Sequence, residues 1–272
     1  MKLTVKCPAK INIFLAVGPV DSRRYHPLRT IFQAVDLCDT VTVEYTTEPT
    51  QITCNWEGLP AENTVSKALR YLREAAVLPE FKIHIEKVIP AESGLGGGSS
   101  DSAGLIRAIM RWVPEALPGH TAQEIAFAVG ADVPFFLVGG RARGEGYGEI
   151  LTPLPDEPVQ HLVIARPNVG VSTASAYAQL DEKPREFLDF PADDRLYNDF
   201  ERTAPCECLD LIERLASLGA TKSGLSGSGS AVFGFFKTEA EAETAAAQVK
   251  SEGIPFAVPT RTLTRKESLW IS

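Results

Sequence analysis

The residues with the clearest chemical potential form one short segment, residues 93–104 (SGLGGGSSDSAG), with five glycines and four serines. An apolar pattern typical of an amphipathic helix follows it directly. A helix N-terminus presents up to four backbone N–H groups without intrahelical partners, together with a partial positive charge. Glycines expose these groups to an incoming oxyanion, and serines add hydroxyl donors. The segment therefore predicts a phosphate-binding loop.

An ordinary turn is the alternative, because Ser99 or Ser100 would cap a helix in any protein. Three consecutive glycines are more than a cap requires, which favours the phosphate site. The segment is not a Walker A loop, and it does not match the dinucleotide-binding fingerprint. A second glycine-rich segment, residues 223–230 (SGLSGSGS), fits a tight turn before a strand as well as it fits a second phosphate loop.

Three further residues could do chemistry. Lys10 and Asn12 interrupt an apolar, strand-like segment and share one strand face. A buried lysine needs an anionic partner or shifts its pKa, and a surface-facing strand lysine is the alternative. Asp132, in the segment GADVPFF, could be a general base; alone, however, the local pattern favours an N-cap for a short following helix.

Composition excludes several classes of protein. The chain has 272 residues and a formal charge of −8, which argues against a broad basic surface for nucleic acid. No segment is apolar and long enough to span a bilayer, and Lys10 and Asn12 argue against a signal peptide. We expect a soluble, cytoplasmic protein with reduced thiols. The cysteines lack zinc-like spacing and the histidines are scattered: Cys7, Cys38, Cys54, Cys206, Cys208, His26, His84, His120 and His161.

The elements that must position these residues are mixed in type. Alternation predicts strands over residues 3–17, 39–45, 81–90, 161–167 and 231–236, with further strands at the end of the chain. Helical spacing predicts helices over residues 63–76, after the glycines to about residue 113, and over 121–129, 206–220 and 238–252. Strict alternation of strand and helix is absent, which favours an α+β fold. A Pro- and Asp-rich link predicts two domains, residues 1–157 and 158–272.

Three separated segments together resemble the galactokinase–homoserine kinase–mevalonate kinase–phosphomevalonate kinase (GHMP) superfamily. They are CPAKINIFL at residues 7–15, PAESGLGGGSSDSAG at residues 90–104 and LSGSGSAVFGFF at residues 225–236. Further segments in order (YHPLRTIFQAVDLCDTV, GADVPFFL, GEGYGEIL, GVSTASAY and NDFE) resemble the members that act on a cytidine diphosphate-linked methylerythritol. The resemblance implies the two-domain GHMP fold and ATP-dependent phosphorylation of the 2-hydroxyl of that alcohol, in the non-mevalonate isoprenoid pathway. ATP and alcohol would meet in a cleft between the domains.

The resemblance also implies roles for particular residues. Asp132 matches the catalytic base, and Lys10 matches a cation that lies near this base and near the transferring phosphoryl group. Asn12 would hydrogen-bond the substrate or fix the base. Residues around the glycine loop would bind the nucleotide: Pro90, Ala91, Glu92, Ser93, Gly94, Leu95, Gly96, Gly97, Gly98, Ser99 and Ser100. ATP chemistry implies Mg²⁺, whose ligands the sequence leaves unknown; Ser100 is the best side-chain candidate, and a plain helix cap is at least as good an interpretation.

On the substrate side, Tyr25 and His26 match a pair that would hold the pyrimidine, and Tyr177 is a second candidate for stacking. A tyrosine near a turn more often has a packing role. Members of the superfamily branch usually have Asp-Gly before the Tyr-His pair, whereas this chain has Arg23 and Arg24, so the turn must close without its glycine. Ser102 stands where a small apolar residue is usual. Segment NDFE reads as a capping box from Asn198 to Glu201, with no chemistry assigned.

Two other functions compete with this interpretation. A different small-molecule kinase of the superfamily, of the homoserine or mevalonate type, is disfavoured by the Tyr25–His26 segment and by GVSTASAY. A non-catalytic nucleotide-binding module is disfavoured because both Lys10 and Asp132 are present.

Overall fold

The computed structural model describes residues 2–57, 59–115, 117–193 and 195–272. Its strands are β1 (Lys2–Val17), β2 (Leu28–Thr46), β3 (Gln51–Cys54), β4 (Glu80–Glu86), β5 (Arg141–Glu145), β6 (Ile150–Pro153), β7 (His161–Arg166), β8 (Tyr197–Asn198), β9 (Lys222–Leu225), β10 (Val232–Phe236) and β11 (Phe256–Arg261). Its helices are α1 (Thr64–Ala75), α2 (Gly97–Trp112), α3 (Gly119–Val129), α4 (Phe135–Val138), α5 (Thr173–Asp181), the 3₁₀ turn η1 (Asp199–Arg202), α6 (Cys206–Ser217), α7 (Glu239–Ser251) and α8 (Arg265–Ser268).

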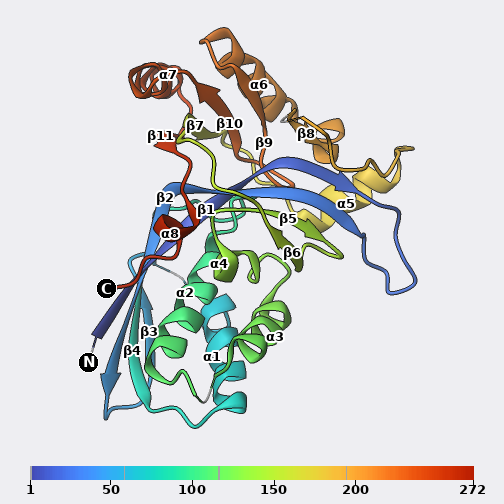
Figure 1. Cartoon of the computed structure of the whole chain (residues 1–272). Coiled ribbons are helices and arrows are strands. Elements are labelled where there is room, and N and C mark those ends of the chain that lie inside the picture. Colours follow the sequence, from blue (N-terminus) through green and yellow to red (C-terminus); the bar gives the residue numbers. More distant parts are fainter. Residues whose placement is uncertain (1, 58, 116, 194) are drawn as a thin grey trace.

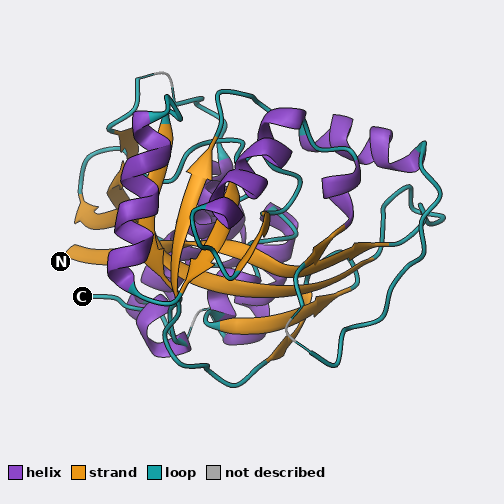
Figure 2. Ribbon diagram, turned by 90° about the horizontal axis from the view of Figure 1, so that it is seen from above, coloured by secondary structure: helices purple, strands orange, loops and turns teal. Residues whose placement is uncertain are grey.

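The strands form two sheets. A seven-stranded sheet has the order β3-β4-β2-β1-β8, with β5 paired to β2 and β6 to β5, and a four-stranded antiparallel sheet has the order β11-β7-β10-β9. In Figure 1 the long strands β1 and β2 cross the middle of the molecule, with α1–α4 on one side and the four-stranded sheet with α6 and α7 on the other. Figure 2 shows the same arrangement from above. The α+β, two-domain expectation is confirmed.

Strand β1 is buried along most of its length because it separates two cores. Leu3, Val5 and Cys7 pack against α1–α4, whereas Ala9, Ile11 and Ile13 pack toward β7 and β10. The register of β1 against β2 shifts between Pro8 and Ala9 and again between Asn12 and Phe14. Such bulges re-aim side chains. The two shifts bracket Lys10 and Asn12, whose side chains line a cavity.

The expected helical faces are buried as the periodicity indicated. Val65, Ala68, Leu69 and Leu72 of α1 form part of the core, as do Phe81, Ile83 and Ile85 of β4. Other elements differ from expectation. Strand β2 runs for 19 residues instead of the seven predicted, and β3, β5 and β6 had no counterpart in the sequence interpretation.

The division at residue 157 stays a prediction, and main-chain pairing crosses it at several places. Strand β8 pairs in parallel with β1, and the C-terminus returns to the first sheet through a hydrogen bond from Thr4 N–H to the carbonyl of Ser272 (2.9 Å). Within the described ranges, no helix has the length and apolar character needed to cross a membrane.

Candidate active site

One large cavity, of about 1070 Å³, lies where the two halves of the chain meet. Its wall combines β1, the loop before α2, the turn before α4, helix α5 and the second glycine-rich segment. Lys10, Asn12, Tyr25, His26, Asp132 and Tyr177 all line it. The structure thus brings together every catalytic and substrate-side residue that the sequence nominated.

The glycine loop lies on this cavity and leads into α2. Gly96, with φ of +75°, is the residue before the helix, and no side chain caps the helix N-terminus. The first N–H groups of α2, beginning at Gly97, therefore face the cavity that Gly96–Ser99 line. The alternative in which Ser99 or Ser100 caps the helix is wrong, because both serines lie inside its first turn.

Not every residue of the predicted loop reaches the cavity. Leu95 is fully buried in the core, and Ser100 is fully buried with no hydrogen-bond partner for its hydroxyl in the described part of the chain. Neither residue lines the cavity. Ser100 therefore gains no support as a magnesium ligand. The other nominated loop residues line the cavity: Pro90, Ala91, Glu92, Ser93, Gly94, Gly96, Gly97, Gly98 and Ser99.

The second glycine-rich segment is bonded directly to the first. The Ser226 hydroxyl donates to the carbonyl of Gly94 (3.0 Å), and Ala231 N–H donates to the carbonyl of Ser93 (3.0 Å). A Cβ built on Gly94 would lie 2.1 Å from the carbonyl oxygen of Ser226, so only glycine fits there. Gly227 and Ser228 line the same cavity. The two loops thus form one continuous surface, and a phosphate-binding role for residues 223–230 stays a prediction.

Asn198 is a supporting residue that sequence reasoning missed. It is buried, and its Nδ2 donates to the carbonyls of Leu225 and Gly227 (both 2.8 Å), which holds the second loop in place. Asn198 does accept from Phe200 N–H as a cap, but the Glu201 carboxylate accepts from Leu225 N–H instead of closing a capping box. The capping-box expectation is therefore half wrong. The short NDFE segment carries no local signal for a partner 27 residues away.

Lys10 and Asp132 face each other across the cavity. Lys10 Nζ lies 3.8 Å from Asp132 Oδ2 and donates to Asn12 Oδ1 (2.7 Å). The Asn12 oxygen also accepts from Gly227 N–H (2.9 Å), so the lysine is tied to the second glycine loop through Asn12. Lys10 N–H donates to the carbonyl of Leu95 (2.9 Å), which ties β1 to the first loop.

The two side chains differ in burial. Lys10 is only 3% exposed, whereas the Asp132 side chain is 37% exposed and open to a ligand in the cavity. Burial lowers the pKa of Lys10 below its ordinary value, and the Asp132 carboxylate opposes that change. The expectation that Lys10 is buried beside an anionic partner is confirmed by the geometry. The N-cap alternative for Asp132 is wrong, since α4 begins at Phe135 after Pro134 and no side chain caps it.

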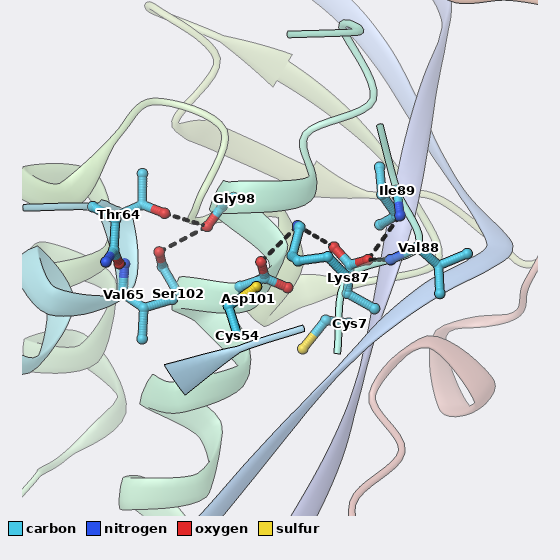
Figure 3. Close-up of polar contacts among 12 residues, drawn as sticks. Cys7, Cys54, Thr64, Val65, Lys87, Val88, Ile89, Gly98, Asp101 and Ser102 are labelled. Carbon is cyan, nitrogen blue, oxygen red and sulfur yellow. Dashed lines mark hydrogen bonds and ion pairs between the residues drawn. The ribbon is translucent and has the colours of Figure 1, made fainter. Parts of the chain in front are cut away.

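A buried charge cluster supports the glycine loop from behind. Lys87 Nζ contacts the carboxylates of Asp39 and Asp101, and Figure 3 shows its bond to Asp101 (2.8 Å). A Cβ on Gly97 would lie 3.1 Å from Lys87 Nζ, so the ammonium group lies directly beside the loop. Asp39 also accepts from the N–H groups of Val88 and Ile89.

The pKa of Asp101 shifts in the sense that burial gives, whereas the pKa of Lys87 shifts against the effect of burial. Burial, followed by the neighbouring Asp39 carboxylate, raises the pKa of Asp101 to about 7, against the opposing charge of Lys87. Burial alone would lower the pKa of Lys87, but the charges of Asp101 and Asp39 raise it overall. The lysine is therefore cationic beneath the loop. Sequence reasoning did not nominate this cluster, because its members come from three separate elements.

The start of α2 is also held by hydroxyl groups. Thr64 Oγ1 and Ser102 Oγ each donate to the carbonyl of Gly98 (both 2.8 Å), as Figure 3 shows. Ser102, at a position where a small apolar residue is usual, thus finds a partner within its own helix. Both bonds fix the backbone at the start of α2, where the first N–H groups of the helix face the cavity.

Aromatic rings line the opposite end of the cavity. His26 and Tyr177 are stacked, with ring centroids 4.9 Å apart, and Tyr177 meets Phe200 edge to face. The Nδ1 atom of His26 lies 2.9 Å from the carbonyl of Gly18, and Nε2 lies 3.3 Å from the Asp181 carboxylate. Because both ring nitrogens have protein partners, the backbone of His26 is the freer group for contact with a ligand. Burial, followed by the charge of Asp132, raises the pKa of Tyr177.

Tyr25 is 63% exposed at the rim of this aromatic end, and its ring lies 5.4 Å from that of Tyr147. Asp21 organises the turn before it. Its carboxylate accepts from Arg23 N–H (2.9 Å), Tyr25 N–H (3.1 Å) and the Tyr147 hydroxyl (2.6 Å). The turn thus closes without its glycine, as the sequence requires, and Arg24 takes the left-handed conformation with φ of +63°.

The end of the cavity nearest α1 was not predicted. Trp56, Leu59, Val65 and Ile85 give it an apolar lining beside the glycine loop. Val65 lies in the first turn of α1, which Asn63 caps in a capping box with Ser66. The helical pattern of α1 was visible in the sequence, but nothing local showed that its first turn would face a ligand cavity.

The comparisons with known proteins agree with this geometry. The GHMP kinases N terminal domain matches residues 63–140, and the GHMP kinases C terminal domain matches residues 207–255. A homoserine kinase from Cytophaga hutchinsonii has the same fold, with a TM-score of 0.69 at 20% identity over 100% of this chain and 97% of that one. Fold and cleft together define a GHMP kinase.

Similarity to named relatives narrows the class. The 4-diphosphocytidyl-2-C-methyl-D-erythritol kinases of Geobacter metallireducens and Geobacter sulfurreducens are 39% and 37% identical, each over 96% of this chain and 99% of the relative. A crystal structure of 4-(cytidine 5'-diphospho)-2C-methyl-D-erythritol kinase superposes with a TM-score of 0.82 at 30% identity, covering 95% of this chain and 98% of that one. The chain belongs to the 4-diphosphocytidyl-2-C-methyl-D-erythritol kinase family.

Proposed function

We propose that this chain transfers the γ-phosphoryl group of ATP to the 2-hydroxyl of 4-diphosphocytidyl-2-C-methyl-D-erythritol, in the non-mevalonate route to isoprenoid precursors. The observation that carries the proposal is the Lys10–Asp132 pair, 3.8 Å apart, in the same cavity as the N-terminus of α2. One cavity therefore offers a base, a cation and an anion-binding loop, which are the parts that phosphoryl transfer requires.

The negative charge of the triphosphate would direct the nucleotide to the glycine loop. The first N–H groups of α2 and the bare backbone of Gly96–Gly98 would bind the triphosphate, with the Lys87 ammonium adding positive charge from behind. The apolar end lined by Trp56, Leu59 and Val65 would take the adenine. The γ-phosphoryl group would then point toward Lys10.

The cytidine-linked alcohol would bind at the aromatic end of the cavity. Its pyrimidine would lie between Tyr25 and the stacked pair His26 and Tyr177, an interaction worth roughly 1–3 kcal/mol per base. The reactive hydroxyl would then reach Asp132, whose partly exposed carboxylate accepts its proton. The alcohol oxygen attacks the γ-phosphorus, the bond from that phosphorus to the β-phosphate bridge breaks, and ADP leaves.

Lys10 stabilises negative charge on the transferring group from a buried position, where electrostatic interactions are strong. Asn12 holds this ammonium group and the second glycine loop with the same amide oxygen. Asn12 therefore links the ammonium group of Lys10 to the second glycine-rich loop.

The loop offers magnesium oxygen ligands from the side chains of Glu92 and Ser99. Mg²⁺ prefers oxygen ligands and keeps several waters while it bridges substrate phosphates. Glu92, whose exposed carboxylate lines the cavity at the start of the glycine loop, is the side chain that we place nearest to it. The ion would neutralise charge on the triphosphate. In the described residues no group of three or more His, Cys, Asp or Glu could hold a metal by itself.

The expected partners are small molecules, ATP and the cytidine-linked alcohol, with no nucleic acid, and we place the reaction in the cytoplasm. The net charge of −8 argues against binding to nucleic acid. All five cysteines are free thiols, which agrees with a reducing compartment.

The test is ATP consumption by the purified protein with Mg²⁺ and one acceptor at a time. We expect turnover with 4-diphosphocytidyl-2-C-methyl-D-erythritol and none with homoserine or mevalonate. Phosphorus and carbon NMR of the product would then locate the new phosphate on the 2-oxygen. Turnover with homoserine or mevalonate alone would overturn the proposal, as would a phosphate on any other oxygen.

A further inference from the structure

Two residues with strained backbone line the large cavity. In the described residues, only Arg24 (φ +63°) and Glu92 (φ +51°) are non-glycine residues with positive φ, and both line the large cavity. The left-handed conformation costs an ordinary residue roughly 1–2 kcal/mol, and such strain persists mainly at functional sites. A glycine at position 24 would remove the strain, yet the chain has an arginine there.

The turn holds Arg24 rigidly in that conformation. Arg24 N–H donates to the carbonyl of Asp21 (3.0 Å), Asp21 N–H donates to the carbonyl of Tyr25 (2.8 Å), and the Asp21 carboxylate is bonded to Tyr147. The backbone at position 24 is therefore fixed from both sides, and its side chain lies on the cavity wall next to Tyr25. Arg23, the preceding residue, does not line the cavity.

The positive charge of Arg24 is available to a ligand. Three cations, Lys10, Arg24 and Lys87, line the cavity together with His26. Lys10 is paired with Asp132, and Lys87 is paired with Asp39 and Asp101. Over the described ranges of the chain, no carboxylate lies within ion-pair distance of Arg24. An arginine on a cavity wall without an acidic partner suits a phosphate group, which its planar guanidinium can bind through two parallel hydrogen bonds.

We propose that Arg24 binds the diphosphate of the cytidine-linked alcohol and so strengthens the binding of a nucleoside diphosphate conjugate in this chain. The proposal rests on the function proposed above. With the pyrimidine held beside Tyr25, the diphosphate follows directly along the substrate, and Arg24 is the neighbouring residue on the wall. The strained arginine is retained because its side chain contributes to binding more than its backbone costs in stability.

The decisive variant is Arg24→Gly, since glycine relieves the strain and removes the guanidinium together. We expect the melting temperature to rise by about 2–4 °C, while KM for the cytidine-linked alcohol rises about ten- to a hundredfold. We expect kcat and KM for ATP to stay within about twofold, because the triphosphate and the base lie elsewhere. The KM of Arg24→Lys for the cytidine-linked alcohol should fall between those of Arg24→Gly and the parent. Arg23→Ala changes the same turn at a residue that does not line the cavity, and its KM should match that of the parent.

Calorimetric titration with CDP and with cytidine separates a phosphate contact from a general effect on the turn. CDP should bind to Arg24→Gly at least tenfold more weakly than to the parent, and cytidine equally well. Equal loss for both probes, or no loss for either, overturns the assignment. If the parent protein fails to turn over the alcohol, the proposed function fails, and the CDP titration still decides whether Arg24 binds a diphosphate.

Discussion

The hydroxyl of Ser226 is hydrogen-bonded to the carbonyl of Gly94, at 3.0 Å, across 132 positions of sequence. This bond joins two glycine-rich loops that approach the cavity from different halves of the chain. The proposed nucleotide site would therefore depend on the contact between the halves, which leaves no room for a side chain at position 94.

Gly94→Ala tests this contact. The new Cβ would lie 2.1 Å from the carbonyl oxygen of Ser226, so the loops must separate. We expect a loss of about 3 kcal/mol or more in the free energy of unfolding, and an ATP dissociation constant raised at least tenfold. Urea denaturation and nucleotide titration measure the two effects.

Gly219→Ala is the matched control. Gly219 has a similar positive φ of +100°, but a Cβ there would meet nothing within 4 Å. This variant carries the backbone strain alone, about 1–2 kcal/mol, and ATP binding should be unchanged. Equal losses of stability in the two variants would show that the loop contact at Gly94 contributes nothing.

Lys10→Met should separate catalysis from stability. Burial already lowers the pKa of Lys10, so replacing the ammonium group with an apolar side chain of similar length removes a cost of desolvation. We expect kcat to fall by about 10²–10³ while the free energy of unfolding is unchanged or higher. Lys6→Met, on the same strand with a half-exposed side chain, should change neither quantity. A Lys10→Met enzyme with full activity would remove Lys10 from the mechanism.

Asp101 gives a prediction about pH. Burial raises its pKa to about 7, against an ordinary value of 3.8, so between these values the folded chain binds a proton that the unfolded chain releases. The free energy of unfolding therefore falls as pH rises from about 4 to about 7, by on the order of 2–4 kcal/mol from this group. Asp101→Asn should lose that component of the pH dependence.

Denaturant titrations across this pH range make the comparison. Asp210→Asn serves as the control, because Asp210 is exposed on α6 and its replacement should leave the pH profile of the parent intact. If Asp101→Asn and the parent show the same slope of stability against pH, the buried cluster does not hold a proton in this range.

Asn198→Ala tests support of the second loop. The two carbonyls that its amide satisfies, on Leu225 and Gly227, would be left without that donor in a buried place. We expect a loss of about 1–3 kcal/mol in stability and weaker ATP binding, because Gly227 lines the cavity. Asn168→Ala, at an exposed position before α5, should have no effect. Unchanged stability in Asn198→Ala would contradict the supporting role.

Local pattern was enough to predict part of this site. The alternation of β1 placed Lys10 and Asn12 on one face, and the glycines before an amphipathic stretch placed a helix N-terminus beside them. Both signals come from residues close together in sequence, and periodic patterns are reliable over such short ranges. The identity of the partner across the cavity, Asp132, came from resemblance, since the local pattern favoured a cap.

The rest depends on pairing over long distances, which one sequence does not show. Lys87 meets Asp39 and Asp101 only because β2, β4 and α2 pack together, and no spacing in the chain marks these residues as partners. The 19 residues of β2 include polar residues that are buried at the sheet centre, such as Gln33. These residues interrupt the apolar alternation by which a strand is predicted from sequence. Similarly, the sequence could predict that Arg24 strains its turn, but only the structure shows that Arg24 lines the cavity.

In the proposed mechanism, Asp132 takes the proton of the attacking alcohol while the glycine loops hold ATP independently. Asp132→Asn keeps the shape of the side chain and removes its basicity. Single-turnover phosphorylation of 4-diphosphocytidyl-2-C-methyl-D-erythritol, with ATP binding measured on the same samples, tests the claim directly. We predict a rate lower by about 10²–10⁴ with an ATP dissociation constant within twofold of the parent. A rate equal to that of the parent would contradict the account.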